Sequence, residues 1–449
     1  MYANFACLMA IRSTTFGVSP LYSQAFGAGN HYRCGLVLMR ILLLHTLMMI
    51  FMSLPLTMAA GPLLRAFGQP EAIATKAQTF VYVRLAALPG TILYTDLTAF
   101  LNAQRCVRLP MVVGTTTAVL QSILMFPMTR WLGFLGAPIA MTALETFQGM
   151  ALLCATPWVL RREKLRSWPP WCRERRQAWR GWSEIIAKGS PAAVMILSEW
   201  FGWEVTIFIA SRLCGTASDG KCPEVEAIPI CTSVMVLQFI VAFGHCLSCS
   251  IRVGNLLGAG QPQAARFCAA VAWCMASGTQ ALNAILILTH RDAIAALFVH
   301  DESVRTHVYE LMPYTTAYSI LATMAAGWSQ QLLFGLGARL RVPAAINFVS
   351  FFGVGIPAGS ALAFDAGLAE RGLWTGLVIA MALVTLGQYF YIFVFTDWDV
   401  ASKKARDRAL NKDRLPDEHS SSGRSEPTEP HAAGRGLAAA DSAVAALEM

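Results

Sequence analysis

Two glutamates, Glu199 and Glu204, lie in the middle of an apolar stretch that runs from Gly189 to Leu213. About 20 helical residues cross a hydrocarbon core of about 30 Å, so this stretch is long enough to span a bilayer. A carboxylate near the bilayer centre is costly, must face protein, water or a partner, and marks a functional site by default. Such a group can bind a proton or a cation.

Trp200 and Trp203 flank the same region and could stack on a flat lipophilic cation, a contact worth up to about 2 kcal/mol when desolvated. Packing against neighbouring helices explains either indole equally well. The two glutamates are five residues apart, about 500° around a helix, so they point about 140° apart and are not expected to share one proton. We assign ion coupling to Glu199 and expect Glu204 to bond neighbouring helices or to line a cavity.

Three further polar residues fall inside apolar segments: Asp96, Gln238 and Gln331. Asp96 could face a cavity, but a hydrogen bond to Thr95 or a contact with Gln104 explains it at least as well. The two glutamines could bind substrate, or they could pair helices with one another, as polar side chains often do in membranes.

The composition is that of a membrane protein, with 55% hydrophobic and 14% charged residues. The net charge of +8 comes from Lys and Arg between the apolar blocks. That pattern is typical of cytoplasmic loops and does not indicate a nucleic-acid surface. We find no nucleotide-binding loop, nucleophile elbow or metal-ligand spacing, so the sequence predicts neither an enzyme nor a cofactor or metal site.

The apolar blocks predict an all-α polytopic membrane protein with about 11 transmembrane helices, since continuous runs favour helices over a barrel. The expected spans are Ala3–Leu21, Leu36–Leu56, Phe80–Leu101, Met111–Trp131, Leu135–Leu160, Pro191–Leu213, Ile228–Ile251, Phe267–Leu288, Val308–Phe334, Ala344–Leu362 and Leu373–Phe395.

Loop charge predicts the orientation. Residues 161–188 contain nine Lys or Arg against three Glu, so this linker is expected in the cytoplasm. The other basic loops then fall on the same side, with the N-terminus outside and the C-terminus inside. We expect a multi-pass protein of the plasma membrane or of an organellar membrane.

An internal repeat divides the chain. Residues 24–30 (QAFGAGN) correspond to 255–261 (NLLGAGQ), and 104–110 (QRCVRLP) to 337–343 (GARLRVP). Both pairs are expected at the cytoplasmic side. This predicts two helical bundles related by a parallel pseudo-repeat, with a working cavity between them.

The expected domains are therefore an N-lobe (1–160), a basic cytoplasmic linker (161–188), a C-lobe (189–396) and a tail (397–449). Ser, Glu, Pro, Gly and Ala dominate the tail with little apolar periodicity, which predicts disorder.

The loop after the seventh span contains Arg252, Gly254, Asn255 and Gly258, and Arg266 follows it. Glycine permits positive φ and close approach, so we expect a tight turn between helices. The two arginines would serve as cytoplasmic anchors or gate charges.

At these residues the sequence resembles the multidrug and toxic compound extrusion (MATE) family of cation-coupled antiporters, in particular its eukaryotic branch. The likeness rests on four blocks: LYSQAFGAG at 21–29, GSPAAVM at 189–195 followed by EWFGWE at 199–204, RVGNLLGAG at 252–260 with AAR at 264–266, and NFVSFFGVGIPAG at 347–359. The resemblance implies twelve helices in two lobes, alternating access, and export of organic cations or metabolites against protons, or against sodium in some members.

The chain departs from the family pattern in two ways. Its first span matches the family's second helix, so the first helix is missing. Thr323 stands where the family's tenth helix often has an acid, and Ser19 replaces an acid of the second, so the resemblance does not extend to a two-acid sodium site.

The sequence thus predicts a secondary antiporter in which protonation of Glu199 releases an organic cation and deprotonation restores a negative site. Two alternatives stay open. One is export of an organic anion such as citrate, using Arg12, Arg40 and Arg84. The other is a truncated membrane protein without transport.

Overall fold

The computed structural model describes residues 9–66, 71–169, 175–210, 212–213 and 222–411, and within these ranges every regular element is a helix. The all-α prediction is confirmed. The elements up to the basic linker are α2 (Ala10–Gly27), α3 (His31–Met48), η2 (Met49–Ser53), α4 (Leu54–Met58), α5 (Ala60–Ala66), α6 (Glu71–Leu85), α7 (Leu88–Ala103), α8 (Arg108–Leu132), η3 (Gly133–Leu135), α9 (Gly136–Arg162) and α10 (Arg175–Ala178).

The elements after the linker are α11 (Trp182–Ala210), α12 (Pro223–Gly258), α13 (Pro262–Thr289), α14 (Arg291–Phe298), α15 (Glu302–Ala322), η4 (Thr323–Ser329), α16 (Gln330–Leu336), α17 (Arg341–Phe348), η5 (Val349–Gly355), α18 (Ile356–Phe364), α19 (Ala369–Phe395) and α20 (Trp398–Asn411). In both parts of the chain, short π-helical turns interrupt longer helices: η2 before the linker, and η4 and η5 after it.

In its described residues, each expected span falls mainly on one of these helices or on helices that continue one another; residues 3–8 of the first span and 211 of the sixth lie outside the described residues. Among the described residues, seven helical segments are long and apolar enough to cross a membrane. One of them, Arg108–Arg162, joins two expected spans through a turn at Gly133, whose φ is +59°. Large apolar side chains such as Phe51, Trp131 and Phe393 point outward from these segments and are 75–80% exposed, as expected of surfaces that contact lipid.

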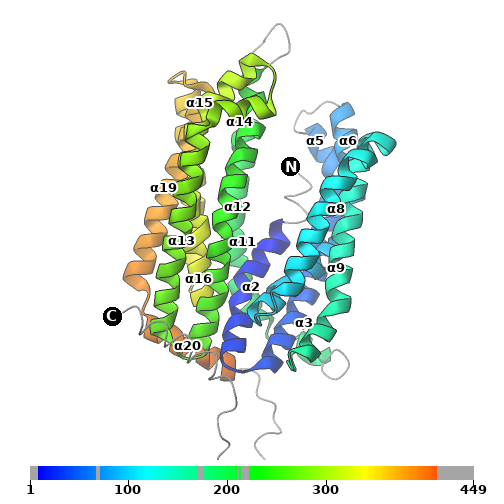
Figure 1. Cartoon of the computed structure of the whole chain (residues 1–449), viewed down its shortest axis with the longest axis vertical. Helices are drawn as coiled ribbons and strands as arrows, with labels where there is room; N and C mark the ends of the chain where they lie inside the picture. Colours follow the sequence, from blue (N-terminus) through cyan, green and yellow to red (C-terminus); the bar gives the residue numbers. More distant parts are fainter. Residues whose placement is uncertain (1–8, 67–70, 170–174, 211, 214–221, 412–449) are drawn as a thin grey trace, which may run out of the picture. The chain divides into compact units, whose positions relative to one another are not determined.

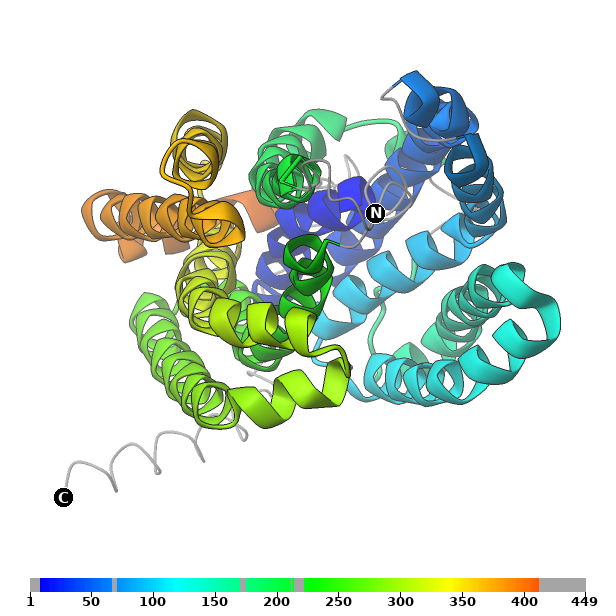
Figure 2. The ribbon, with the colours of Figure 1, turned by 90° about the horizontal axis from the view of Figure 1, so that it is seen from above.

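The helices pack as two groups, which we call the N-bundle (α2–α9) and the C-bundle (α11–α19). Leu38, Leu97 and Phe100 belong to the apolar core of the N-bundle, whereas separate cores form in the C-bundle around Leu332 and around Trp374. Figure 1 shows α8 and α9 on one side and α12 and α13 on the other, with α2 between them. Seen from above, α2 and α11 lie side by side (Figure 2), and α2 also packs against α12. Helix α2 therefore joins the two bundles.

Two pairs of turns repeat the same local geometry. Gly29 and Gly260 have φ of +78° and +80°, and the residue after each donates its amide to a carbonyl five residues earlier. Arg105 and Gly337 likewise have φ of +63° and +60° in matching turns. At Gly29 and Gly260 the sequence repeat is thus also a repeat of backbone conformation. The turns at Arg105 and Gly337 match in conformation but are shifted by one residue from the sequence correspondence, in which Gln104 aligns with Gly337.

The tail prediction is wrong for residues Trp398–Asn411, which form α20. Ala405 and Ala409 of this helix are buried, and Ser402 donates a hydrogen bond to the Leu257 carbonyl at 3.1 Å. Two small apolar residues four positions apart give the helix one docking face. The helix could not be recognised by apolar periodicity, because most of its residues are charged or polar. The rest of the tail lies outside the described residues.

Candidate functional site

Glu199 lies on α11, half-buried, opposite α15. The Tyr318 hydroxyl donates a hydrogen bond to Glu199 Oε1 at 3.4 Å, and the Trp203 indole N–H donates to the Tyr318 oxygen at 2.9 Å. Within the described part of the chain, no basic side chain forms an ion pair with Glu199. The carboxylate therefore has a phenol donor but no cationic partner among the described residues, which leaves its charge open to neutralisation by a proton or by a cation.

The two tryptophans have different surroundings. Trp203 is buried in the C-bundle, where its ring makes edge contacts with Tyr318 and Trp374, each at 4.9 Å between ring centroids. It supports the phenol that bonds Glu199, and its faces are occupied by protein. Trp200 is 41% exposed, so its ring can still be reached. Glu204 is half-buried farther along the same helix.

Glycines bring the two bundles into backbone contact. A Cβ at Gly258 of α12 would stand 2.2 Å from the carbonyl oxygen of Gln24, and one at Gly254 would stand 2.1 Å from the Ser23 hydroxyl. Reciprocally, a Cβ at Gly27 of α2 would stand 2.0 Å from the Asn255 carbonyl oxygen. Three of the predicted gate residues, Gly254, Asn255 and Gly258, thus form the contact between α2 and α12. The glycine-rich loop makes the expected tight turn at Gly260, whereas Gly254 and Gly258 lie within α12 and permit close approach.

The remaining predicted gate residues, Arg252 and Arg266, are exposed. Besides the Arg33–Glu184 ion pair between α3 and α11, Gln24 and Arg408 provide polar links between the bundles at this end. Gln24 donates to the Gly335 carbonyl at 3.1 Å and accepts from Arg408 of α20, also at 3.1 Å. Arg408 also donates to the Gly337 carbonyl at 3.1 Å. Neither residue stood out in the sequence, since Arg408 lies in a segment expected to be disordered.

The two candidate glutamines are buried in the C-bundle. Gln238 and Gln331 are each 3% exposed, and within the described residues neither the Gln238 amide group nor the Gln331 Oε1 has a hydrogen-bond partner. Thr323 donates a hydrogen bond to Gln280 Oε1 at 3.3 Å. The position where the family often has an acid is therefore part of a neutral amide–hydroxyl contact.

Asp96 lies apart from Glu199, in the core of the N-bundle. It accepts hydrogen bonds from the Thr15 hydroxyl at 2.9 Å and from His45 Nδ1 at 2.8 Å. The expected contacts with Thr95 or Gln104 are wrong, because α7 turns Asp96 toward α2 and α3. His45, an ionisable residue inside an apolar span, was a signal that the sequence reading overlooked.

Two of the three arginines considered for anion binding have other partners. Arg84 donates to both oxygens of Glu145 at 2.7 and 2.9 Å, and Arg40 donates to the Gln177 carbonyl at 3.3 Å. Arg12 is exposed.

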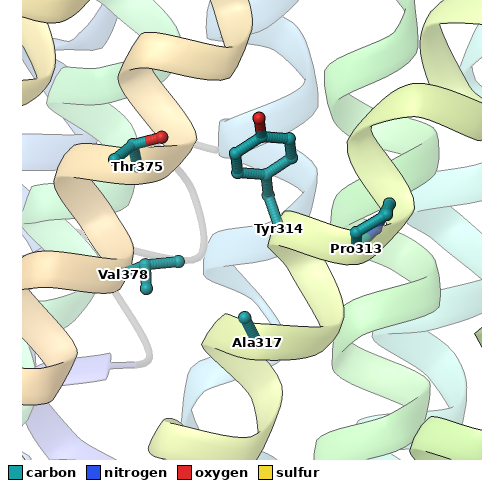
Figure 3. Close-up of a pocket in the computed structure, with 5 residues that line it drawn as sticks. All are labelled: Pro313, Tyr314, Ala317, Thr375 and Val378. Atoms are coloured by element: carbon teal, nitrogen blue, oxygen red, sulfur yellow. The ribbon is translucent and has the colours of Figure 1, made fainter.

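An open groove of about 300 Å³ lies between α15 and α19 (Figure 3). Its lining residues are Pro313, Tyr314, Ala317, Thr375 and Val378. None of them is charged, so the groove lacks the carboxylate that a cation site requires, and the site is better placed at Glu199. Among the described residues, no group of three His, Cys, Asp or Glu side chains could hold a metal ion.

The MatE family model matches residues 2–127 and 191–360. Multidrug and toxin extrusion protein 2 of Mus musculus is 28% identical over 394 residues, which cover 87% of this chain and 65% of the relative, so the chain spans about two thirds of that protein's length. Protein DETOXIFICATION 37 of Arabidopsis thaliana is 26% identical over 87% of this chain and 76% of its own length.

The fold also matches a solved structure. The crystal structure of the eukaryotic MATE transporter AtDTX14 superposes with a TM-score of 0.82 at 22% identity, covering 91% of this chain and 89% of that one. Together with the model match, which spans more than half of the sequence, this makes the chain an integral multi-pass membrane protein of the MATE family.

Proposed function

We propose that the protein is a secondary antiporter that exports organic cations in exchange for protons, with Glu199 as the coupling residue. The observation that carries this proposal is the Glu199 carboxylate, half-buried on a helix long and apolar enough to span a membrane and, among the described residues, bonded by the Tyr318 hydroxyl and by no basic group. A charge in such a place is retained for what it binds. The names of the relatives, which refer to multidrug and toxin extrusion, support the same class of substrate.

In the proposed cycle, the ionised carboxylate attracts a cation from the cytoplasm, and a proton from outside neutralises Glu199 and releases the cation. Both ligands compete for one negative charge, so each must leave before the other binds. Trp200, whose ring can be reached, would offer a face to a flat cation. Trp203 acts indirectly by holding Tyr318.

Protons are favoured over sodium as the coupling ion. A sodium ion needs several oxygen ligands, whereas Glu199 has one phenol beside it and Thr323 is bonded to Gln280. A proton needs only the carboxylate. Cations are favoured over anions as substrates, because Arg84 is neutralised by Glu145 and Arg40 is bonded to a backbone carbonyl.

We further propose that the N-lobe comprises residues 1–160, the linker 161–188 and the C-lobe 189–396. The separate apolar cores of the two bundles support this division. The basic linker and α20 would face the cytoplasm, because Lys and Arg are concentrated there.

The test is dye efflux from proteoliposomes driven by a pH gradient. Glu199→Gln should abolish coupled efflux, because the amide neither ionises nor takes up a proton, and Glu204→Gln on the same helix is the matched control that should retain it. A substrate panel must include a cationic dye and citrate. Coupled efflux by Glu199→Gln, or transport of citrate but not of the dye, would overturn the proposal, and so would a folded protein that transports neither.

A further inference from the structure

Four polar side chains, Thr15, Asp96, His45 and Thr14, form a linear series of contacts inside the N-bundle, apart from Glu199. Asp96 of α7 accepts from Thr15 of α2 at 2.9 Å and from His45 Nδ1 of α3 at 2.8 Å, while Thr14 Oγ1 lies 2.6 Å from His45 Nε2. His45 and Asp96 are 0% exposed. The proposed transport cycle does not use any of these groups.

The charge of this cluster depends on one proton. With a neutral imidazole the buried cluster carries the single negative charge of Asp96, and with an imidazolium it is neutral. A buried charge without a counter-charge is strongly disfavoured. The cluster is therefore expected to bind one proton and to keep it until the site is opened to water.

Most other charged or titratable groups on the neighbouring helices are engaged elsewhere or exposed; His31, whose Nδ1 is buried without a partner among the described residues, lies at the opposite end of α3 from His45. Glu145 is paired with Arg84, Glu184 with Arg33, Lys188 with the Ala338 carbonyl, and Glu199 with Tyr318; Arg40 bonds the Gln177 carbonyl, and His245 lies 3.2 Å from the Thr279 hydroxyl. Tyr22 is buried, while Arg12, Arg108, Arg130 and Arg252 are exposed. His45 is therefore the group positioned to balance Asp96.

Thr14 lets the imidazole hold or release this proton without moving heavy atoms. When the ring is neutral, its Nδ1–H donates to Asp96 and its Nε2 accepts from the Thr14 hydroxyl. When a proton binds Nε2, the new N–H donates to Thr14 Oγ1, and the hydroxyl hydrogen turns to the Ile11 carbonyl at 2.8 Å or the Ala10 carbonyl at 3.1 Å. Every polar hydrogen has an acceptor in both states.

The same threonine lies at the contact between the bundles. A Cβ at Gly189 of α11 would stand 3.5 Å from Thr14 Cβ, and one at Gly17, a turn further along α2, would stand 2.5 Å from the Ala192 side chain. Separation of α2 from α11 would uncover Thr14 and, behind it, His45 Nε2. Proton exchange at His45 is thereby tied to movement of the bundles.

We propose that the His45–Asp96 pair is a second proton-binding site, which takes one proton on His45 Nε2 and gives it up when α2 and α11 part. Thr14 is a positioning residue that serves as alternate donor and acceptor to the ring. This inference rests on the proposed antiport, to which it adds a second exchanged proton.

The first experiment measures the ratio of protons to substrate in proteoliposomes held at zero membrane potential. At the balance point the dye gradient rises about tenfold per pH unit for each proton exchanged. The unaltered full chain should balance about a hundredfold dye gradient per pH unit, and His45→Gln about a tenfold one. Thr14→Val should balance a tenfold dye gradient per pH unit, as His45→Gln does. Thr14→Ser, which keeps the hydroxyl, should balance the hundredfold gradient of the unaltered chain.

The proposal would be overturned if the unaltered protein balanced only a tenfold dye gradient per pH unit. It would also be overturned if both His45→Gln and Thr14→Val still balanced a hundredfold one. Thr14→Val has the shape of threonine, so it serves if His45→Gln does not fold.

The second experiment does not depend on transport. The ¹⁵N resonances of His45, identified by their loss in His45→Gln, should change from the neutral-ring form to the imidazolium form as the full-length protein in detergent is acidified. Resonances that stay in one form throughout would overturn the second site even if the antiport proposal holds. If transport fails but the resonances titrate, the antiport proposal and its second exchanged proton are lost, whereas the proton-binding site itself stands.

Discussion

The Tyr318 hydroxyl reaches across from α15 to α11 and donates to Glu199 Oε1 at 3.4 Å. The bond joins two helices of the C-bundle through the carboxylate proposed to carry the proton. Trp203 fixes the phenol from the other side, so the position of Glu199 depends on residues from both helices.

Tyr318→Phe should slow coupled efflux about fivefold, because one net hydrogen bond contributes about 1 kcal/mol. Tyr314→Phe is the matched control, since Tyr314 lies four residues earlier on α15 and lines the apolar groove in Figure 3. Initial rates of dye efflux at a fixed pH gradient provide the measurement. Equal rates for the two variants would show that the phenol does not support Glu199.

Gly258→Ala should destabilise the protein by about 1–3 kcal/mol, as expected when an extra carbon is forced into a filled contact. The added Cβ would stand 2.2 Å from the Gln24 carbonyl oxygen, so α2 and α12 must move apart. Gly244→Ala on the same helix has no atom within 4 Å of the new Cβ and should be neutral or slightly stabilising. Thermal unfolding in detergent compares the two, and equal melting temperatures would contradict the close contact.

Arg408→Ala should loosen α20, because it removes the bonds to Gln24 and to the Gly337 carbonyl. Hydrogen exchange of the backbone amides of α20 should then speed up severalfold at unchanged global stability. Lys403→Ala removes the same charge from an exposed position of this helix and should leave the exchange rates unchanged. If both variants exchange at the rate of the unaltered protein, Arg408 does not hold the helix.

Arg84→Ala should destabilise the N-bundle by about 3–5 kcal/mol, the usual cost of leaving one partner of a buried ion pair alone. Arg84 is 5% exposed, and Glu145 would keep its charge without a cation beside it. Arg305→Ala breaks the exposed pair with Glu302 and should cost at most about 1 kcal/mol. Unfolding by heat separates the two outcomes. A small effect of Arg84→Ala together with lost citrate transport would instead support the anion alternative.

The membrane helices could be predicted from the sequence because apolar runs of about 20 residues have few other uses. The turns at Gly29 and Gly260 were detectable for a related reason, since a repeated motif with glycine encodes a repeated conformation. Two features of α20 could not be found this way. Its docking face is made of two alanines, and its main anchor, Arg408, resembles any other charge of the tail.

The candidate site was predicted in part. The position of Glu199 within an apolar span can be predicted from the sequence. Its partner Tyr318, however, is 119 residues away along the chain and becomes a neighbour only through helix packing. The same holds for His45, which meets Asp96 51 residues later. Periodicity describes one helix at a time, whereas these pairs are set by which faces of two helices meet.

The π-helical turn η4, between α15 and α16, gives this span a further property. A π turn contains one residue more than an α turn, so the excess residue can pass along the helix as a register slip. Each slip of one residue rotates the following side chains by about 100° around the axis. Gln330 and Gln331 come directly after η4. A slip through η4 would therefore turn both glutamine side chains around the helix axis while Tyr318, which precedes the turn, keeps its hydrogen bond to Glu199.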